Sequence, residues 1–277
     1  MSIWTAALLG LVQGIAEFLP ISSSGHLSII NNLFNLSEIQ NGHMLFDVLL
    51  HLATLISILI VYWQDLMQML YELLGFVNVG PLAGQRQERY PSARMFIMLV
   101  LATLPLFLIL PIRKQLESLY YQNVFIGVSL ILTGCMLYVA DKMIPGKKTE
   151  RSMTISDALI IGLCQCVATI PGLSRSGTTI TAGIATGLRR EFAVKFSFLL
   201  SIPAVLGANI LSIADAVKAG IDWASVPAYL IGMVFALISG VASIHFLRYI
   251  SAKGRFGGFA YYCWVVGVLA IVMSLIF

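Results

Sequence analysis

Long apolar runs separated by short polar segments make up most of the chain. Six of these runs approach or exceed the roughly 20 residues that a helix needs to cross a bilayer. They lie at about 43–63, 94–111, 123–143, 192–213, 225–246 and 256–277. The runs lack the ten-residue alternation of apolar and polar residues that is typical of transmembrane strands. The pattern therefore predicts six membrane-spanning helices.

Two further apolar regions, 3–35 and 155–188, are interrupted in the middle by Pro, Gly and Ser. The interruptions read PISSSG at 20–25 and PGLSRSG at 171–177. Proline removes a helix hydrogen bond and glycine weakens the helix, so each region is predicted to be a re-entrant hairpin, two helices with a break between them. Irregular backbone at membrane depth needs protein or a water-filled cavity around it. The two breaks are therefore expected to line a cavity.

Composition supports a membrane protein and excludes several other classes. Of 277 residues, 58% are hydrophobic and 11% are charged, and the mean hydropathy is +0.90. A soluble domain carries about 25% charged residues, so a soluble enzyme or a disordered chain is excluded. The net charge of +4 is scattered along the chain, which gives no nucleic-acid-binding surface. We predict an all-α, polytopic helical membrane protein that forms one integral membrane domain, 1–277.

The distribution of Lys and Arg predicts the orientation. If the hairpins return and the six runs cross, thirteen cations fall on one side: Arg86, Arg89, Arg94, Lys142, Lys147, Lys148, Arg151, Arg189, Arg190, Lys195, Arg248, Lys253 and Arg255. Only three fall on the other side: Arg113, Lys114 and Lys218. The positive-inside rule makes the first side cytoplasmic, so both termini are expected on the periplasmic side.

The two broken regions are related by an internal repeat. A shift of 152 aligns GLVQGIAEFLPISSSGH at 10–26 with GLCQCVATIPGLSRSGT at 162–178, and seven of the seventeen positions are identical. Three spans, an odd number, separate the hairpins, so the second unit enters from the opposite face. We predict an inverted repeat, with one unit at about 3–143 and the other at about 155–277. In such folds the broken helices meet near the midplane.

Arg175 is the most informative polar residue, because a cation at membrane depth costs at least about 2.5–3.5 kcal/mol and needs a partner or a ligand. The hydroxyls of Ser174, Ser176 and Thr178 surround it in sequence. A helix N-terminus and an Arg fork together suit phosphate oxygens. The alternative is an internal ion pair between Arg175 and Glu17.

Glu17 and Gln13 are four residues apart and share one helix face. A carboxylate beside an amide can hold a divalent cation or take a proton.

His26 follows Ser22, Ser23 and Ser24 in the first break, where an imidazole can act as a general acid or base. His51 lies inside an apolar span, and we expect it to have a packing role.

Two segments also carry a family resemblance. QGIAEFLPISSSGH at 13–26 resembles the first signature of the undecaprenyl-diphosphate phosphatase family, the bacitracin-resistance type. PGLSRSGTT at 171–179 is similar to its second signature, and FDVLLHLAT at 46–54 and FSFLLSIP at 196–203 also fit. The resemblance extends over essentially the whole chain.

The resemblance implies a bacterial inner-membrane enzyme that hydrolyses undecaprenyl diphosphate to undecaprenyl phosphate and inorganic phosphate, which recycles the cell-wall lipid carrier. It implies a divalent cation, Mg²⁺ or Ca²⁺, and an active site open to the periplasmic side. The partners are the lipid diphosphate and membrane lipids, and a homodimer is left open.

Matching positions give each residue a role. Glu17, Ser23, His26 and Arg175 are assigned as catalytic, and Glu17 with Gln13 as the metal-binding pair of the (Glu/Gln)-x-x-x-Glu motif. The hydroxyls assigned to substrate binding are those of Ser22, Ser24, Ser174, Ser176 and Thr178. The nucleophile stays open between Ser23, another serine, His26 and water.

A polyprenyl-phosphate flippase or an ion-coupled secondary transporter is the alternative function, because inverted repeats and broken helices are transporter features. A carrier needs Arg175 and Glu17 but has no need of a Ser/His pair.

Overall fold

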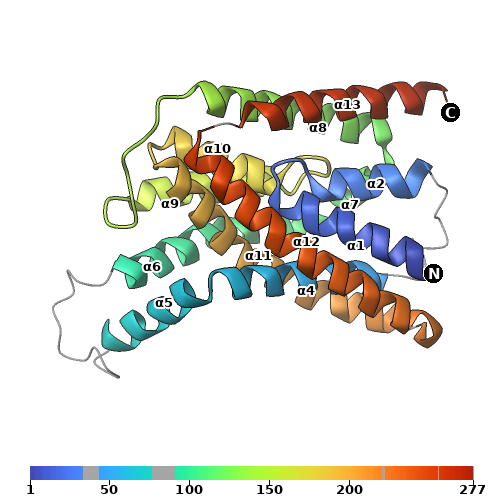
Figure 1. The fold of residues 1–277 in the computed structure, drawn as a ribbon, viewed down its shortest axis with the longest axis horizontal. Coiled ribbons are helices and arrows are strands. Elements are labelled where there is room, and N and C mark those ends of the chain that lie inside the picture. The colour runs from blue at the N-terminus through green and yellow to red at the C-terminus, as the bar shows by residue number, and fades with distance from the viewer. Residues whose placement is uncertain (34–43, 77–90, 220–221, 255, 277) are drawn as a thin grey trace.

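The chain forms a bundle of helices in which both termini lie at the same end (Figure 1). The computed structural model describes residues 1–33, 44–76, 91–219, 222–254 and 256–276.

The predicted spans are confirmed in number and position. They correspond to α4 (Met44–Val61), α6 (Pro91–Thr103) continued by the 3₁₀ helix η2 (Leu104–Ile112), α8 (Asn123–Lys142), α11 (Arg190–Ala219), α12 (Val226–Ala252) and α13 (Gly257–Ile276). Short connecting helices are α7 (Arg113–Glu117), η3 (Ser118–Tyr121) and η4 (Trp223–Ser225). Within the described ranges, five helical stretches are long and apolar enough to cross a membrane, and α4 with its bent continuation makes six.

That continuation, α5 (Trp63–Phe76), was not expected from the apolar pattern. It leaves α4 at an angle of 73° and packs on α6. Glu72, 2% exposed, accepts hydrogen bonds from the backbone N–H groups of Ser92 and Ala93 at 2.6 and 3.0 Å. The carboxylate thereby caps the N-terminus of α6, where these N–H groups have no partner within the helix.

Both hairpins are broken helices, as predicted. They consist of α1 (Ile3–Phe18) with α2 (Ser23–Leu33) and α9 (Ile155–Val167) with α10 (Arg175–Ala185). The longest of the four, α1, has 16 residues and spans about 24 Å, short of the roughly 30 Å hydrocarbon core. Because α1 packs on α2 and α9 packs on α10, each hairpin folds back on itself.

The contacts between elements follow the order expected of an inverted repeat. The first spans of the two units, α4 and α11, pack together, and so do the third spans, α8 and α13. The leading hairpin helices exchange: α1 packs on α12 and α9 packs on α6, each the second span of the other unit. The unit boundaries near 3–143 and 155–277 stay a prediction.

Glycines at equivalent repeat positions allow this exchange. A Cβ atom added to Gly10 of α1 would lie 2.1 Å from the carbonyl oxygen of Gly232 on α12, and one added to Gly162 of α9 would lie 2.4 Å from the carbonyl oxygen of Ala102 on α6. Small residues let helix backbones approach closely in membranes, where packing rather than the hydrophobic effect drives association. The repeated glycine therefore marks a helix–helix contact in both units.

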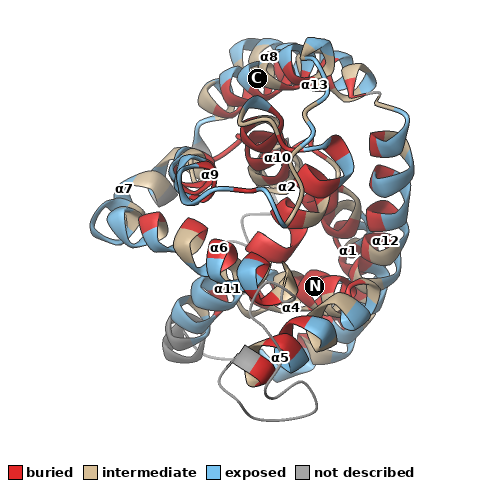
Figure 2. Cartoon of the chain, turned by 90° about the vertical axis from the view of Figure 1, so that its left-hand side faces the viewer, coloured by how far each residue is buried: buried red, intermediate tan, exposed pale blue. Residues whose placement is uncertain are grey.

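Buried residues face the interior between the helices (Figure 2). The outer surface of the long helices is apolar, with exposed side chains such as Phe107, Ile210, Ile238 and Val265. A soluble protein rarely shows so much exposed apolar surface. The molecule is therefore a multi-pass membrane protein whose outer surface is covered by lipid.

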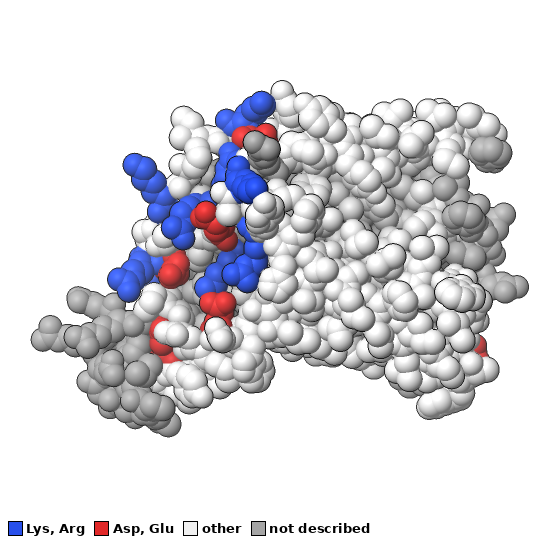
Figure 3. Space-filling view, viewed as in Figure 1, with Lys and Arg blue, Asp and Glu red and all other residues white. Residues whose placement is uncertain are grey.

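Lys and Arg gather at the end of the molecule opposite the two termini (Figure 3). Lys148 pairs with Asp157 at 2.8 Å and Lys195 with Asp65 at 2.5 Å. Of the thirteen cations predicted on one side, Arg86, Arg89 and Arg255 lie outside the described residues.

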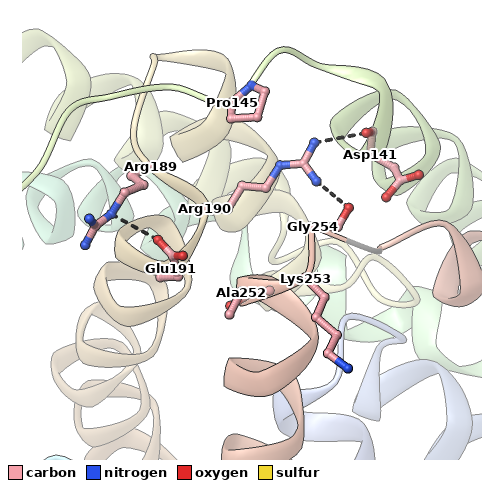
Figure 4. Close-up of a pocket in the computed structure, with 9 residues that line it drawn as sticks. Asp141, Pro145, Arg189, Arg190, Glu191, Ala252, Lys253 and Gly254 are labelled. Atoms are coloured by element: carbon pink, nitrogen blue, oxygen red, sulfur yellow. Dashed lines mark hydrogen bonds and ion pairs between the residues drawn. The ribbon is translucent and has the colours of Figure 1, made fainter.

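Arg190 joins three helix ends beside a hollow of about 410 Å³ at the basic end (Figure 4). Its guanidinium donates to the carbonyl oxygen of Gly254 after α12, at 2.5 Å, and to those of Asp141 and Met143 at the end of α8, both at 3.0 Å. Because the last carbonyls of a helix have no partner within it, one side chain at the start of α11 holds two other helix ends in place.

The close contact at Gly10 gives a stability prediction. Gly10→Ala places a methyl group against backbone atoms that cannot rotate away, so α1 must move from α12 at a cost of about 1–3 kcal/mol. We expect a lower midpoint in thermal unfolding of the detergent-solubilised protein. Gly207→Ala is the matched control, because nothing lies within 4 Å of its added Cβ, and it should leave the midpoint unchanged or slightly higher. Equal midpoints for the two variants would contradict the contact.

Candidate active site

The two breaks build the same helix start twice. The hydroxyl of Ser22 accepts a hydrogen bond from the backbone N–H of Gly25 at 3.2 Å, and the hydroxyl of Ser174 accepts one from Gly177 at 3.1 Å. Such N-caps satisfy N–H groups that the first turn leaves free. The Ser-x-Ser-Gly pattern shared by the repeats is therefore the start signal of α2 and α10.

The second serine of each pattern supports the first and joins the two breaks. Ser24 lies 3.2 Å from the Ser22 hydroxyl and accepts from the backbone N–H of Gly172 at 3.3 Å. Ser176 lies 3.2 Å from the Ser174 hydroxyl and donates to the carbonyl oxygen of Leu19 at 3.4 Å. The predicted meeting of the two breaks is thereby confirmed.

Glu17 stands at the centre of the site. It is 8% exposed, and one carboxylate oxygen forms an ion pair with the guanidinium of Arg175 from the other repeat. The other oxygen accepts hydrogen bonds from the Ser23 hydroxyl at 2.6 Å and from the Gln13 amide at 3.2 Å. The ion pair that the sequence offered as an alternative reading is present, and it lies within the same cluster as the predicted catalytic residues.

The surroundings of Arg175 suit an anion. Arg175 is the first residue of α10, and its side chain is 21% exposed, so the guanidinium is held by Glu17 yet remains accessible. Both α2 and α10 begin at the junction of the breaks, and helix N-termini carry partial positive charge. A phosphate entering here meets a guanidinium and two helix starts, an arrangement that favours phosphate binding.

His51 belongs to the site, and the packing role expected for it is wrong. Its Nδ1 lies 3.1 Å from the Gln13 amide nitrogen and 3.8 Å from the Glu17 carboxylate, and its side chain is 39% exposed. The signal was present in the sequence, because an ionisable residue within a span is functional by default.

His26 lies beside the cluster but is not paired with Ser23. Its Nδ1 is 2.8 Å from the Ser22 carbonyl oxygen, and its Nε2 is 2.8 Å from the Tyr262 hydroxyl. The single hydroxyl proton of Ser23 goes to Glu17. The expected Ser/His pairing is therefore replaced by a Ser/Glu pairing.

The predicted metal and substrate ligands are only in part free to act. Among the residues that the structure describes, no three His, Cys, Asp or Glu side chains form a cluster suited to a metal. Gln13 Oε1 is buried without a hydrogen-bond partner, and so is Thr178 Oγ1. Mg²⁺ is commonly held by one or two carboxylates with substrate phosphates completing its shell, and one carboxylate beside an unpartnered amide oxygen fits that pattern.

The sequence matches the family described as bacitracin resistance protein BacA over residues 6–269. A relative from Methanosphaera stadtmanae is 35% identical, covering 100% of this chain and 99% of its own. One from Pelotomaculum thermopropionicum is 39% identical, covering 99% and 97%, and one from Thermodesulfovibrio yellowstonii is 38% identical, covering 98% and 97%. All three are named undecaprenyl-diphosphatase. The matches extend over nearly the full length, and the chain therefore belongs to the BacA family.

Proposed function

We propose that the protein hydrolyses undecaprenyl diphosphate to undecaprenyl phosphate and inorganic phosphate, and thereby recycles the cell-wall lipid carrier and confers bacitracin resistance. The observation that carries this proposal is the buried Glu17 carboxylate shared by Arg175 and Ser23 at the start of two helices. The activity named for full-length relatives supports it.

In this mechanism Arg175 binds the terminal phosphoryl group. Hydrolysis of a diphosphate needs positioning of that group and neutralisation of the charge on its oxygens. A guanidinium offers two parallel N–H donors to phosphate, and the exposed part of Arg175 can engage it. As Arg175 turns toward phosphate, the Glu17 carboxylate loses its ion pair and becomes a stronger base.

Ser23 then attacks the terminal phosphorus. A bond forms between Ser23 Oγ and phosphorus, the hydroxyl proton passes to Glu17 over the 2.6 Å hydrogen bond, and the bond from phosphorus to the bridging oxygen breaks. The electron pair of that bond leaves with undecaprenyl phosphate. Water hydrolyses the phosphoserine in a second step, with His26 accepting the proton of the attacking water. Such pairing of a hydroxyl with a base is the usual activation of a nucleophile.

A divalent cation, Mg²⁺ or Ca²⁺, is part of the proposal. Glu17 and Gln13 are the residues that we assign to hold it, together with phosphate oxygens of the substrate. When bound, the cation neutralises charge on the diphosphate. Ser22, Ser24, Ser174, Ser176 and Thr178 surround the phosphate as the substrate-binding shell, although the first four already serve as caps.

The orientation follows from the basic end of the molecule (Figure 3). We place this end in the cytoplasm of the bacterial inner membrane by the positive-inside rule. Both termini then lie on the periplasmic side, and the active site opens to that side.

Lipid transport is the second candidate function, favoured by two broken helices meeting between inverted repeats. A carrier would use Arg175 and Glu17 to hold the lipid phosphate, but it would not break a bond. Ser23 separates the two functions, because only hydrolysis requires a nucleophile.

Arg175→Ala is predicted to lower kcat/KM for phosphate release from a C55 or C15 isoprenyl diphosphate by about 100-fold or more, since one charge-stabilising donor accounts for about 10²–10³ in rate. Arg175→Lys should recover only part, because an ammonium lacks the planar fork. Arg189→Ala, which removes an exposed guanidinium paired with Glu191, serves as the control. Unchanged release from folded Arg175→Ala would refute the phosphoryl-binding role.

Ser23→Ala is predicted to abolish phosphate release, by about 10³-fold or more, while binding of the lipid diphosphate persists. Ser28→Ala on the same helix is the control and should keep wild-type rates. Both variants are measured in detergent for release and by titration calorimetry for binding. Release within ten-fold of wild type would assign the attack to water instead of Ser23.

EDTA is predicted to stop phosphate release, and Mg²⁺ or Ca²⁺ to restore it. Gln13→Glu should lower the Mg²⁺ concentration needed for half-maximal activity several-fold, because a second carboxylate strengthens an oxygen site for a hard cation. Gln115→Glu on α7 adds the same charge away from the site and should change nothing. Full activity in EDTA would contradict the metal assignment.

A further inference from the structure

His26 is held at both ring nitrogens. Nδ1 lies 2.8 Å from the Ser22 carbonyl oxygen, which can only accept, so Nδ1 carries a proton. In the neutral ring Nε2 then accepts from the Tyr262 hydroxyl at 2.8 Å. The two rings are also stacked, with centroids 5.6 Å apart and planes 6° from parallel.

Tyr262 is itself fixed against the first break. Its neighbour Cys263 directs its thiol toward the carbonyl oxygen of Pro20 at 3.8 Å. Ala260 and Cys263 of α13 form one buried cluster with Ala16 and Ile21 on either side of that break. The part of α13 that carries Tyr262 is thus anchored to the segment between Glu17 and His26, although more than 230 residues separate them in sequence.

We propose that Tyr262 is a positioning residue for His26, an inference that rests on the proposed proton-accepting role of His26. The stacking sets the plane of the imidazole, and the hydroxyl sets its rotation about that plane. A hydroxyl can donate to neutral Nε2 and accept from protonated Nε2–H, so it holds the ring in both charge states. An imidazole held in one orientation loses less activity to misplacement, which costs about 10²-fold for a 1 Å error.

Tyr262 acts through geometry and leaves substrate affinity alone. Arg175 and Glu17, which are assigned to the phosphate and its cation, make no printed contact with it; their partners are each other, Ser23 and Gln13. A loss of the Tyr262 hydroxyl should therefore appear in kcat and leave KM unchanged. A residue that only supported the fold would lower the amount of active protein or alter both constants.

The test is Tyr262→Phe, which keeps the stacked ring and removes the hydrogen bond. We expect kcat to fall about ten-fold, with KM within two-fold of wild type, in phosphate release from a C15 isoprenyl diphosphate. Tyr261→Phe is the matched control, because the adjacent ring is 58% exposed and packs edge-on against Trp264 at 5.5 Å. A kcat equal to that of Tyr261→Phe would overturn the proposal.

A double-mutant cycle separates positioning from structural support. In a His26→Ala background, Tyr262→Phe should produce no further loss, because its partner has gone. The same ten-fold loss in both backgrounds would show that Tyr262 acts independently of His26 and would refute the inference while leaving the hydrolase intact. Wild-type rates in His26→Ala would remove His26 from the mechanism, and absence of release from folded wild-type protein would refute the proposed function itself.

Discussion

A single buried carboxylate links the two halves of this molecule. Glu17 lies on α1 in one repeat, and its ion pair reaches Arg175 at the start of α10 in the other. Neither charge is stable alone at membrane depth, and removing one partner of a buried pair commonly costs 3–5 kcal/mol. The two broken helices therefore need each other, and the phosphate site forms where they meet. A phosphate that draws Arg175 away from Glu17 supplies the negative charge that keeps the guanidinium compensated.

The surrounding fold holds this pair in register by close backbone packing. Gly10 lets α1 approach α12, and Gly162 lets α9 approach α6, so the helices that end at the breaks have little freedom to slide. At the other end, Arg190 joins the ends of α8 and α12 to the start of α11 (Figure 4). Rigid helices position catalytic groups more accurately than loops do. The serine caps then set the direction in which α2 and α10 leave the breaks.

Much of this arrangement could be predicted from local sequence, and the failures have a common cause. Span number, the two hairpins and the contact between breaks follow from apolar run length, from Pro and Gly, and from an odd number of intervening spans. The partners of His26 and His51 do not, because a hydrogen bond to Tyr262 or Gln13 joins residues far apart in sequence. The bend between α4 and α5 was missed for a related reason: Glu72 caps a helix that begins some twenty residues later. The residue types indicated chemistry, whereas the pairings required the fold.

The repeat explains which positions are structural and which are chemical. Identical positions in the two units perform identical structural tasks: Gly10 and Gly162 permit helix contact, and Ser22 and Ser174 cap a helix. The chemistry lies where the units differ, since Ser23 is replaced by Arg175 and Glu17 by Thr169 at equivalent positions.

Gln13 and Gln165 show the consequence of this difference. They are identical in the repeat, yet Gln13 donates to Glu17, whereas both polar atoms of Gln165 are buried without a partner. Because Thr169 stands where the first repeat has Glu17, the second glutamine keeps the position and lacks the carboxylate. An inverted duplication thus supplies two equivalent helix starts, and divergence gives one the base and nucleophile and the other the cation that binds phosphate. A hydrolytic site needs both signs of charge at one point, which two identical halves could not provide.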